Sequence, residues 1–230
     1  MKKILFVIAM EKEAKDIAKE LGLEEKNTGN GKVFEKNNIS LLISGIGKQQ
    51  TAINLTKYIE NNRENLPDII INVGYVGSTK SQIGSWVSVN KSYNYEWLIP
   101  GEQKYEIEGY NKNLIKTINE LPDKITLNEN EKQQTINDVR EMRMNGNSKK
   151  IKVLPCYSAE SFVTLTNITD DVVFDMELHS IYMVCCMYGI ELISLKKVSD
   201  NLSLDDYYKN IDMKEVMELT SSLKLLGMIN

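Results

Sequence analysis

Three apolar runs, separated by segments with helical spacing, occupy the first third of the chain. Runs of this kind predict buried strands, and apolar residues recurring every three or four positions predict amphipathic helices. We therefore expect strands over residues 3–9, 39–43 and 69–74, and helices over residues 11–21 and 48–60. Strands that alternate with helices are typical of an α/β fold with a largely parallel central sheet. Ligands of such sheets bind at the carboxyl ends of the strands.

The rest of the chain continues this pattern around one polar interruption. Residues 111–150 carry charges of both signs, and we expect helices over residues 111–121 and 129–144 there, as an excursion from the core. Strands are expected over residues 85–89, 152–154 and 190–195, and helices over residues 177–188 and 205–226. The 230 residues show no internal repeat or linker, so we predict a single domain over residues 1–230.

Charge and apolar patterning disfavour several classes of protein. The 28 basic and 32 acidic residues are spread along the chain, without the clustered basic face that binding to nucleic acid usually needs. The apolar run after Lys3 is too short for an export signal, and no stretch is long enough to cross a bilayer. We therefore expect a cytoplasmic protein with neither nucleic acid nor a membrane as partner.

Cysteine and histidine, which serve as nucleophiles, bases and zinc ligands, are scarce in this chain. Cys156, Cys185 and Cys186 lie in apolar surroundings without the spacing of a zinc site, which predicts reduced thiols and no metal centre. His179 is the one histidine, and its place in a predicted helix favours a structural role. A Ser-His-Asp or Cys-His catalytic set would need that histidine, so this kind of catalysis is disfavoured.

Three acidic segments each follow an apolar run. They contain Glu11 and Glu13, then Asp175 and Glu177, and finally Asp200. Cleavage of a sugar–base bond needs three such groups: an acid for the departing base, a base for the attacking water, and an anchor for the ribose hydroxyls. Each carboxylate alone is more often a surface or helix-capping residue. Their joint order along the chain predicts a site that cleaves a nucleoside.

Read together, these segments resemble the nucleoside phosphorylase and nucleosidase superfamily, and within it the methylthioadenosine/S-adenosylhomocysteine nucleosidases. The matching segments are the acidic motif at residues 9–13, glycine turns at residues 44–48 and 72–74, the purine-stacking segment at residues 158–163, the ribose motif at residues 175–177, and the pair Ser199-Asp200. The resemblance implies a single-domain, three-layer α/β/α sandwich around a mixed, largely parallel, twisted sheet. It also implies a homodimer and no cofactor.

The resemblance implies catalytic roles for two carboxyl groups. Asp200 would donate a proton to N7 of the purine, with Ser199 orienting it, and Glu13 would take a proton from the attacking water. Asp200 must then hold its proton near neutral pH, which requires partial desolvation to raise its pKa. Its position after the apolar run 192–198 is consistent with this.

The remaining site residues are implied as the substrate-binding set. Glu177 would bind the ribose 2′ and 3′ hydroxyls, with Met176 packed against the sugar, while Phe162 stacks on the purine and the main chain of Val163 binds its edge. Ile46, Tyr75 and Asp175 complete the set through the two glycine turns and the ribose motif.

The sequence departs from the family pattern at several of these positions. Tyr75 replaces a small serine and Ser78 a glycine, and Asp175 stands where a glutamate is common. The loop at residues 201–205, which normally covers the purine, is shorter than usual. These departures leave the base and the 5′ substituent of the substrate open.

We therefore expect a cofactor-free purine nucleoside hydrolase that acts on 5′-methylthioadenosine or S-adenosylhomocysteine and releases adenine. Glu13 favours hydrolysis, since phosphorolysis needs no such base. Two alternatives stay open: a phosphorylase that holds phosphate through Lys48 and Lys196, and a nucleoside-binding protein without turnover. Residues 93–99, which include Trp97, could serve a dimer interface or the core.

Overall fold

The computed structural model describes residues 2–27, 31–97, 114–120, 151–211 and 218–229. Ten described strands form one mixed sheet, in the order β2-β3-β4-β1-β5-β9-β8-β6-β10-β7. The strands are β1 (Ile4–Ile8), β2 (Glu24–Asn27), β3 (Lys32–Lys36), β4 (Ile39–Ile43), β5 (Ile69–Ser78), β6 (Trp86–Asn94), β7 (Ile115–Lys116), β8 (Lys152–Ser158), β9 (Val173–Asp175) and β10 (Glu191–Asp200).

The centre of the sheet is parallel. Strand β1 pairs with β4 and β5, and β5 pairs with β10, all in parallel. Antiparallel pairs extend the edge at β2, β3 and β4. The predicted α/β class with a mixed, largely parallel sheet is confirmed.

Five strands also close into a ring, which the alternation of strands and helices did not predict. Strand β5 bonds to β10 and β9, β10 bonds to β6, β6 to β8, and β8 to β9. A closed ring leaves fewer exposed strand edges than an open sheet. It also brings the ends of β5, β9 and β10, which are far apart in sequence, to one place.

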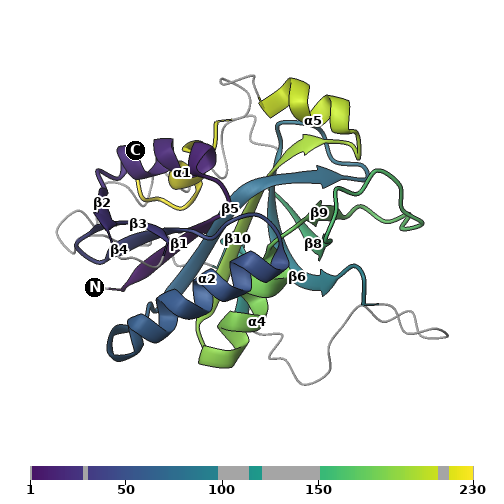
Figure 1. The fold of residues 1–230 in the computed structure, drawn as a ribbon. Coiled ribbons are helices and arrows are strands. Elements are labelled where there is room, and N and C mark those ends of the chain that lie inside the picture. The colour runs from purple at the N-terminus through teal and green to yellow at the C-terminus, as the bar shows by residue number, and fades with distance from the viewer. Residues whose placement is uncertain (1, 28–30, 98–113, 121–150, 212–217, 230) are drawn as a thin grey trace.

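Helices cover both faces of the sheet (Figure 1). They are α1 (Glu11–Glu20), α2 (Lys48–Asn61), α4 (Leu178–Tyr188), α5 (Leu204–Ile211) and α6 (Ser221–Leu225), with single 3₁₀ turns η1 (Arg63–Asn65) and η3 (Ile118–Glu120). Along β1, Leu5 and Val7 join the core beneath α2 and α4, whereas Phe6 and Ile8 join the core beneath α1. Burial on both faces explains why β1 is apolar throughout. No helix among the described residues could span a membrane.

One of the two helices predicted for the polar segment is wrong. Within the predicted helix 111–121, Ile115–Lys116 is a strand that pairs in parallel with β10, and the turn η3 follows it. The edge of β10 offers backbone partners there, and the Ile118 N–H donates to Ser88 Oγ at 3.0 Å. The predicted helix 129–144 lies outside the described residues.

The single helix predicted over residues 205–226 is also interrupted. It is present as α5 and α6, and Glu218 between them is not helical. Lys197 Nζ donates to the Glu218 carbonyl oxygen at 2.9 Å. A tertiary contact thus takes a backbone acceptor that a continuous helix would have used internally.

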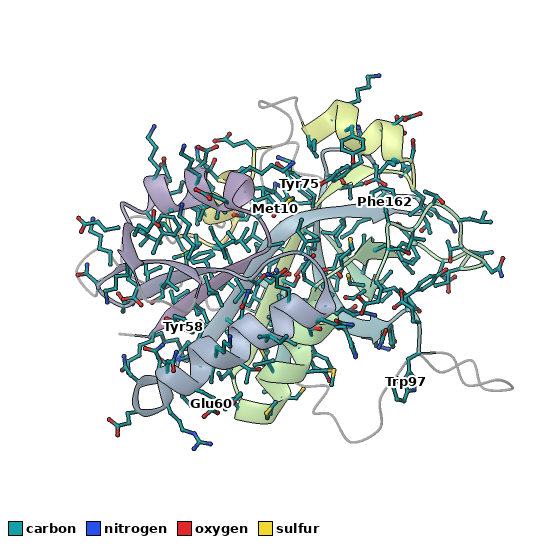
Figure 2. All side chains as sticks on the ribbon, in the orientation of Figure 1. Met10, Tyr58, Glu60, Tyr75, Trp97 and Phe162 are labelled. Atoms are coloured by element: carbon teal, nitrogen blue, oxygen red, sulfur yellow. The ribbon has the colours of Figure 1, made fainter. Side chains whose placement is uncertain are left out.

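The segment predicted to serve an interface or the core is partly packed against the protein and partly exposed. Tyr93 stacks on Tyr157 with ring centroids 4.8 Å apart. Trp97 is exposed, and Figure 2 shows it away from Met10, Tyr75 and Phe162. Residues 98 and 99 lie outside the described residues.

Candidate active site

The ten residues predicted to form the site line a single cavity. They come from loops and elements across the whole chain: Glu13, Ile46, Tyr75, Phe162, Val163, Asp175, Met176, Glu177, Ser199 and Asp200. The cavity lies where β1, β5, β9 and β10 end, and Figure 2 shows Met10, Tyr75 and Phe162 at this end of the sheet, near α1 and α5. The carboxyl edge of the sheet is where an α/β fold is expected to bind its ligand.

Glu13 lies in the first turn of α1, directly after β1. Its carboxylate is buried and accepts a hydrogen bond from the Met10 N–H at 3.2 Å, as a helix-capping glutamate does. Burial, followed by the charge of Glu177, raises the pKa of Glu13 to about 7. The capping contact fixes the side chain at the cavity wall, and the raised pKa suits a group that exchanges a proton near neutral pH.

Asp175 is the most heavily bonded acid in the cavity. Its oxygens accept hydrogen bonds from Ser158 Oγ at 2.5 Å, from the Leu178 N–H at 3.1 Å and from Lys196 Nζ at 2.7 Å. Burial alone would raise the pKa of Asp175, but Lys196 outweighs it and lowers that pKa. Because its acceptor positions are largely occupied by protein groups, we interpret Asp175 as an anchor for the site.

Glu177 joins the start of α4 to the first glycine turn. It stands at the start of α4, and its Oε1 accepts a hydrogen bond from the Gly47 N–H at 2.9 Å. Gly47 has a φ of 89°, a conformation that favours glycine. Burial, followed by the charge of Asp175, raises the pKa of Glu177 to about 7. The first glycine turn and the ribose motif therefore meet at this carboxylate.

Asp200 ends β10 and is buried. Its Oδ1 accepts the Leu202 N–H at 2.9 Å, and its Oδ2 lies 2.7 Å from Ser199 Oγ. Ser199 Oγ also lies 3.1 Å from the Val76 carbonyl oxygen. One hydroxyl proton cannot serve two acceptors at once, whereas a protonated Asp200 could donate to Ser199 while Ser199 donates to Val76. Burial raises the pKa of Asp200, in spite of these hydrogen bonds.

The second glycine turn predicted from the sequence is wrong. Gly74 and Gly77 lie within the continuous strand β5. A Cβ atom on Gly77 would lie 2.8 Å from Asp200 Oδ1, which is closer than side chains tolerate. The glycine therefore provides room for the acid on the neighbouring strand, rather than a turn.

The cavity lining also includes residues that were not predicted to belong to the site, and two of them carry polar side chains that matter here, Lys196 and Tyr207. The sequence assigns Lys196 a role only in the phosphorylase alternative, as a ligand of phosphate, and the structure buries it beside Asp175. Tyr207 was placed in a predicted helix without a role, yet its ring meets Phe162 edge-on with centroids 5.6 Å apart. The short loop after Asp200 was the signal for Tyr207, because it brings α5 directly to the cavity.

Comparison with known proteins identifies the family of the chain. The sequence profile of the phosphorylase superfamily matches residues 3–222, so the chain belongs to that superfamily. No curated protein matches the chain in sequence.

Solved structures share the fold at low sequence identity. A candidate 5′-methylthioadenosine/S-adenosylhomocysteine nucleosidase from Francisella philomiragia is 20% identical, with a TM-score of 0.71 and full coverage of both chains. The futalosine hydrolase of Helicobacter pylori is 17% identical, with a TM-score of 0.72 over 98% of this chain and 97% of its own. The 5′-methylthioadenosine nucleosidase of Arabidopsis thaliana is 18% identical, with a TM-score of 0.71 over 100% and 96%.

The buried ion pair gives a stability prediction. Lys196→Met should lower the free energy of unfolding by about 3–5 kcal/mol, because Asp175 is left buried without its cation. Lys152→Met is the matched control, since Lys152 pairs with Asp171 at the same 2.7 Å but is 53% exposed. Lys152→Met should lower the free energy of unfolding by less than about 1 kcal/mol. Urea unfolding measures both, and equal small losses would contradict the assignment.

Glu13 gives a prediction for pH. Its folded pKa of about 7 lies above the ordinary 4.5, so its contribution to stability is present below pH 4.5 and is lost as pH rises through 7. Relative to Glu13→Gln, the free energy of unfolding of the wild-type protein should fall by on the order of a few kcal/mol between pH 5 and 8. Glu11→Gln is the control, because the hydrogen bond with Lys32 lowers the pKa of Glu11. A flat difference for Glu13→Gln, from urea unfolding at each pH, would overturn the assignment.

Proposed function

We propose that this protein hydrolyses the N-glycosidic bond of a purine nucleoside and releases the free base. One observation carries the proposal: Glu13, Glu177 and Asp200, from three distant segments, line one cavity at the carboxyl edge of the sheet. Their separate environments suit three different tasks. Asp200 is buried with a raised pKa, Glu177 faces the first glycine turn, and Glu13 lies in the first turn of α1.

In the proposed reaction, Asp200 donates its proton to the purine as the bond between C1′ and N9 breaks. The electron pair of that bond leaves with the base, and positive charge develops on the sugar. An ionised Glu177 binds the ribose hydroxyls and stabilises this charge. Water then attacks C1′ and loses a proton to Glu13. A positioned acid and a positioned base each contribute ~10²–10⁴-fold to such reactions.

The cations around the cavity favour water over phosphate as the nucleophile. Among the described residues that line the cavity, Lys196 is the one cation, and it is paired with Asp175. Lys48, the other lysine considered for phosphate, bonds to Asn94 Oδ1 at 2.6 Å and to Glu96. A phosphate ion would therefore meet acids without a free cation to offset their charge.

The proposed substrates are 5′-methylthioadenosine and S-adenosylhomocysteine, with adenine as the released base. 5′-Methylthioadenosine is named for two of the structural neighbours and S-adenosylhomocysteine for one of these two, while futalosine is named for the third. Phe162 supports a purine, because an aromatic ring at the cavity wall can stack on the base.

The test is release of base from each of these nucleosides, with and without phosphate. We expect adenine release that does not require phosphate, and a loss of at least a hundredfold in Asp200→Asn. Asp205→Asn, an exposed acid in the same region, is the matched control and should keep wild-type rates. Strict dependence on phosphate would identify a phosphorylase, and binding without release would identify a protein that does not turn over.

We also propose that the protein is a cytoplasmic homodimer. Its three cysteines are free thiols, which suits a reducing compartment. Ile46, beside the cavity, and Ile53, on α2, are apolar yet 54% and 55% exposed, as expected for a covered interface. Ile53→Glu should therefore give a monomer in sedimentation velocity, whereas Leu165→Glu, at another exposed apolar position, should not. A monomeric wild-type protein would contradict this proposal.

A further inference from the structure

Two tyrosines share the cavity wall with Glu13. Tyr75 lies on β5 and Tyr207 on α5, and both line the cavity that Glu13 and Asp200 enter. Burial, followed by the charge of Glu13, raises the pKa of Tyr207 to about 12, and the same two causes raise the pKa of Tyr75. Both hydroxyls therefore keep their protons at neutral pH and can donate as well as accept hydrogen bonds.

The position of Tyr207 is fixed by the short connection after Asp200. Three residues separate Asp200 from the start of α5, and Leu202 among them has a φ of 62°. Asn210 Nδ2 donates to the Ser199 carbonyl oxygen at 2.9 Å, which ties α5 to the end of β10. The Tyr207 ring also contacts Phe162 edge-on, with centroids 5.6 Å apart. These contacts fix the position of Tyr207 at the cavity wall.

A water molecule that attacks a sugar carbon needs a complete set of partners. It has two O–H bonds and two lone pairs, and ordered buried waters typically make about three hydrogen bonds. In the proposed reaction one O–H points to Glu13 and one lone pair points to C1′. One O–H and one lone pair are left, and a hydroxyl that accepts together with a hydroxyl that donates would satisfy both.

We propose that Tyr75 and Tyr207 are positioning residues that hold the attacking water against Glu13. The inference rests on the proposed hydrolase function and adds the groups that select and orient its nucleophile. Glu13 takes the proton, the water oxygen bonds to C1′, and the two hydroxyls return unchanged after each turnover. Methanol has only one O–H, so it cannot satisfy Glu13 and a hydroxyl acceptor together, and water is therefore the preferred nucleophile at this position.

Isosteric removal of the hydroxyls tests the inference. Tyr75→Phe and Tyr207→Phe should each lower kcat about tenfold, with KM within about twofold, because each loses one hydrogen bond to the water. Tyr208→Phe is the matched control, since Tyr208 is the next residue on α5 and is 60% exposed. It should keep the wild-type kcat. Melting temperatures of the three variants confirm folding.

A second measurement separates water positioning from a structural role. In mixed water and methanol, each turnover yields either the free ribosyl product or its methyl glycoside, with the alcohol proton passing to Glu13 in the second case. The ratio of the two products does not depend on how much protein is folded. We expect the methanol share to rise several-fold in the Phe variants and to stay at the wild-type value in Tyr208→Phe.

The outcomes are distinct. An unchanged kcat with an unchanged product ratio overturns the inference and leaves the hydrolase proposal standing. A change in KM alone also overturns it, and would place the hydroxyls on the 5′ substituent of the substrate. Absence of base release from the wild-type protein would overturn the proposed function itself, and this inference with it.

Discussion

The buried ion pair between Lys196 and Asp175 sets the electrostatics of the cavity. One lysine lies among several acids, and its closest partner is Asp175 at 2.7 Å. That pairing leaves Glu13 and Glu177 without a cation of their own, and burial then raises the pKa of each to about 7. A cavity of this kind favours a ligand that becomes positive during the reaction. A glycosidic bond that breaks toward a cationic sugar meets this condition.

The fold supports this arrangement through the pairing of β5 with β10. The two strands run side by side from Ile69 and Glu191 to Gly77 and Asp200. Because Gly77 has no side chain, the Asp200 carboxylate can lie against the neighbouring backbone, where it is buried. Closure of the ring through β9 brings Asp175 and Glu177 to the same place. Asp200 and Glu177 are therefore positioned by the pairing of their strands as well as by side-chain contacts.

Much of this organisation was predictable from local patterns. Apolar runs identified β1, β4, β5 and β10, and helical spacing identified α1, α2 and α4, because burial imposes a period on the sequence. The short antiparallel strands β2 and β3 were missed, since their polar residues carry little of that signal. The break between α5 and α6 and the strand at Ile115 were also missed, because both depend on contacts with β10.

Ten residues that line the cavity were likewise predictable from the sequence, but the electrostatic interactions among them were not. Motifs in order along the sequence indicated ten residues that line one cavity, and composition disfavoured histidine or metal chemistry. No local pattern indicated that Lys196 would neutralise Asp175 rather than a ligand, and the short loop that brings Tyr207 to the cavity did not indicate that Glu13 would line it too. Lys196 lies 21 positions after Asp175 in the sequence, and Tyr207 lies 194 positions after Glu13. Their spatial relations follow from how strands and helices pack. The local sequence pattern indicates which side chains are buried. The distances between buried charges are set only by the tertiary structure, because the residues that carry them are far apart in the sequence.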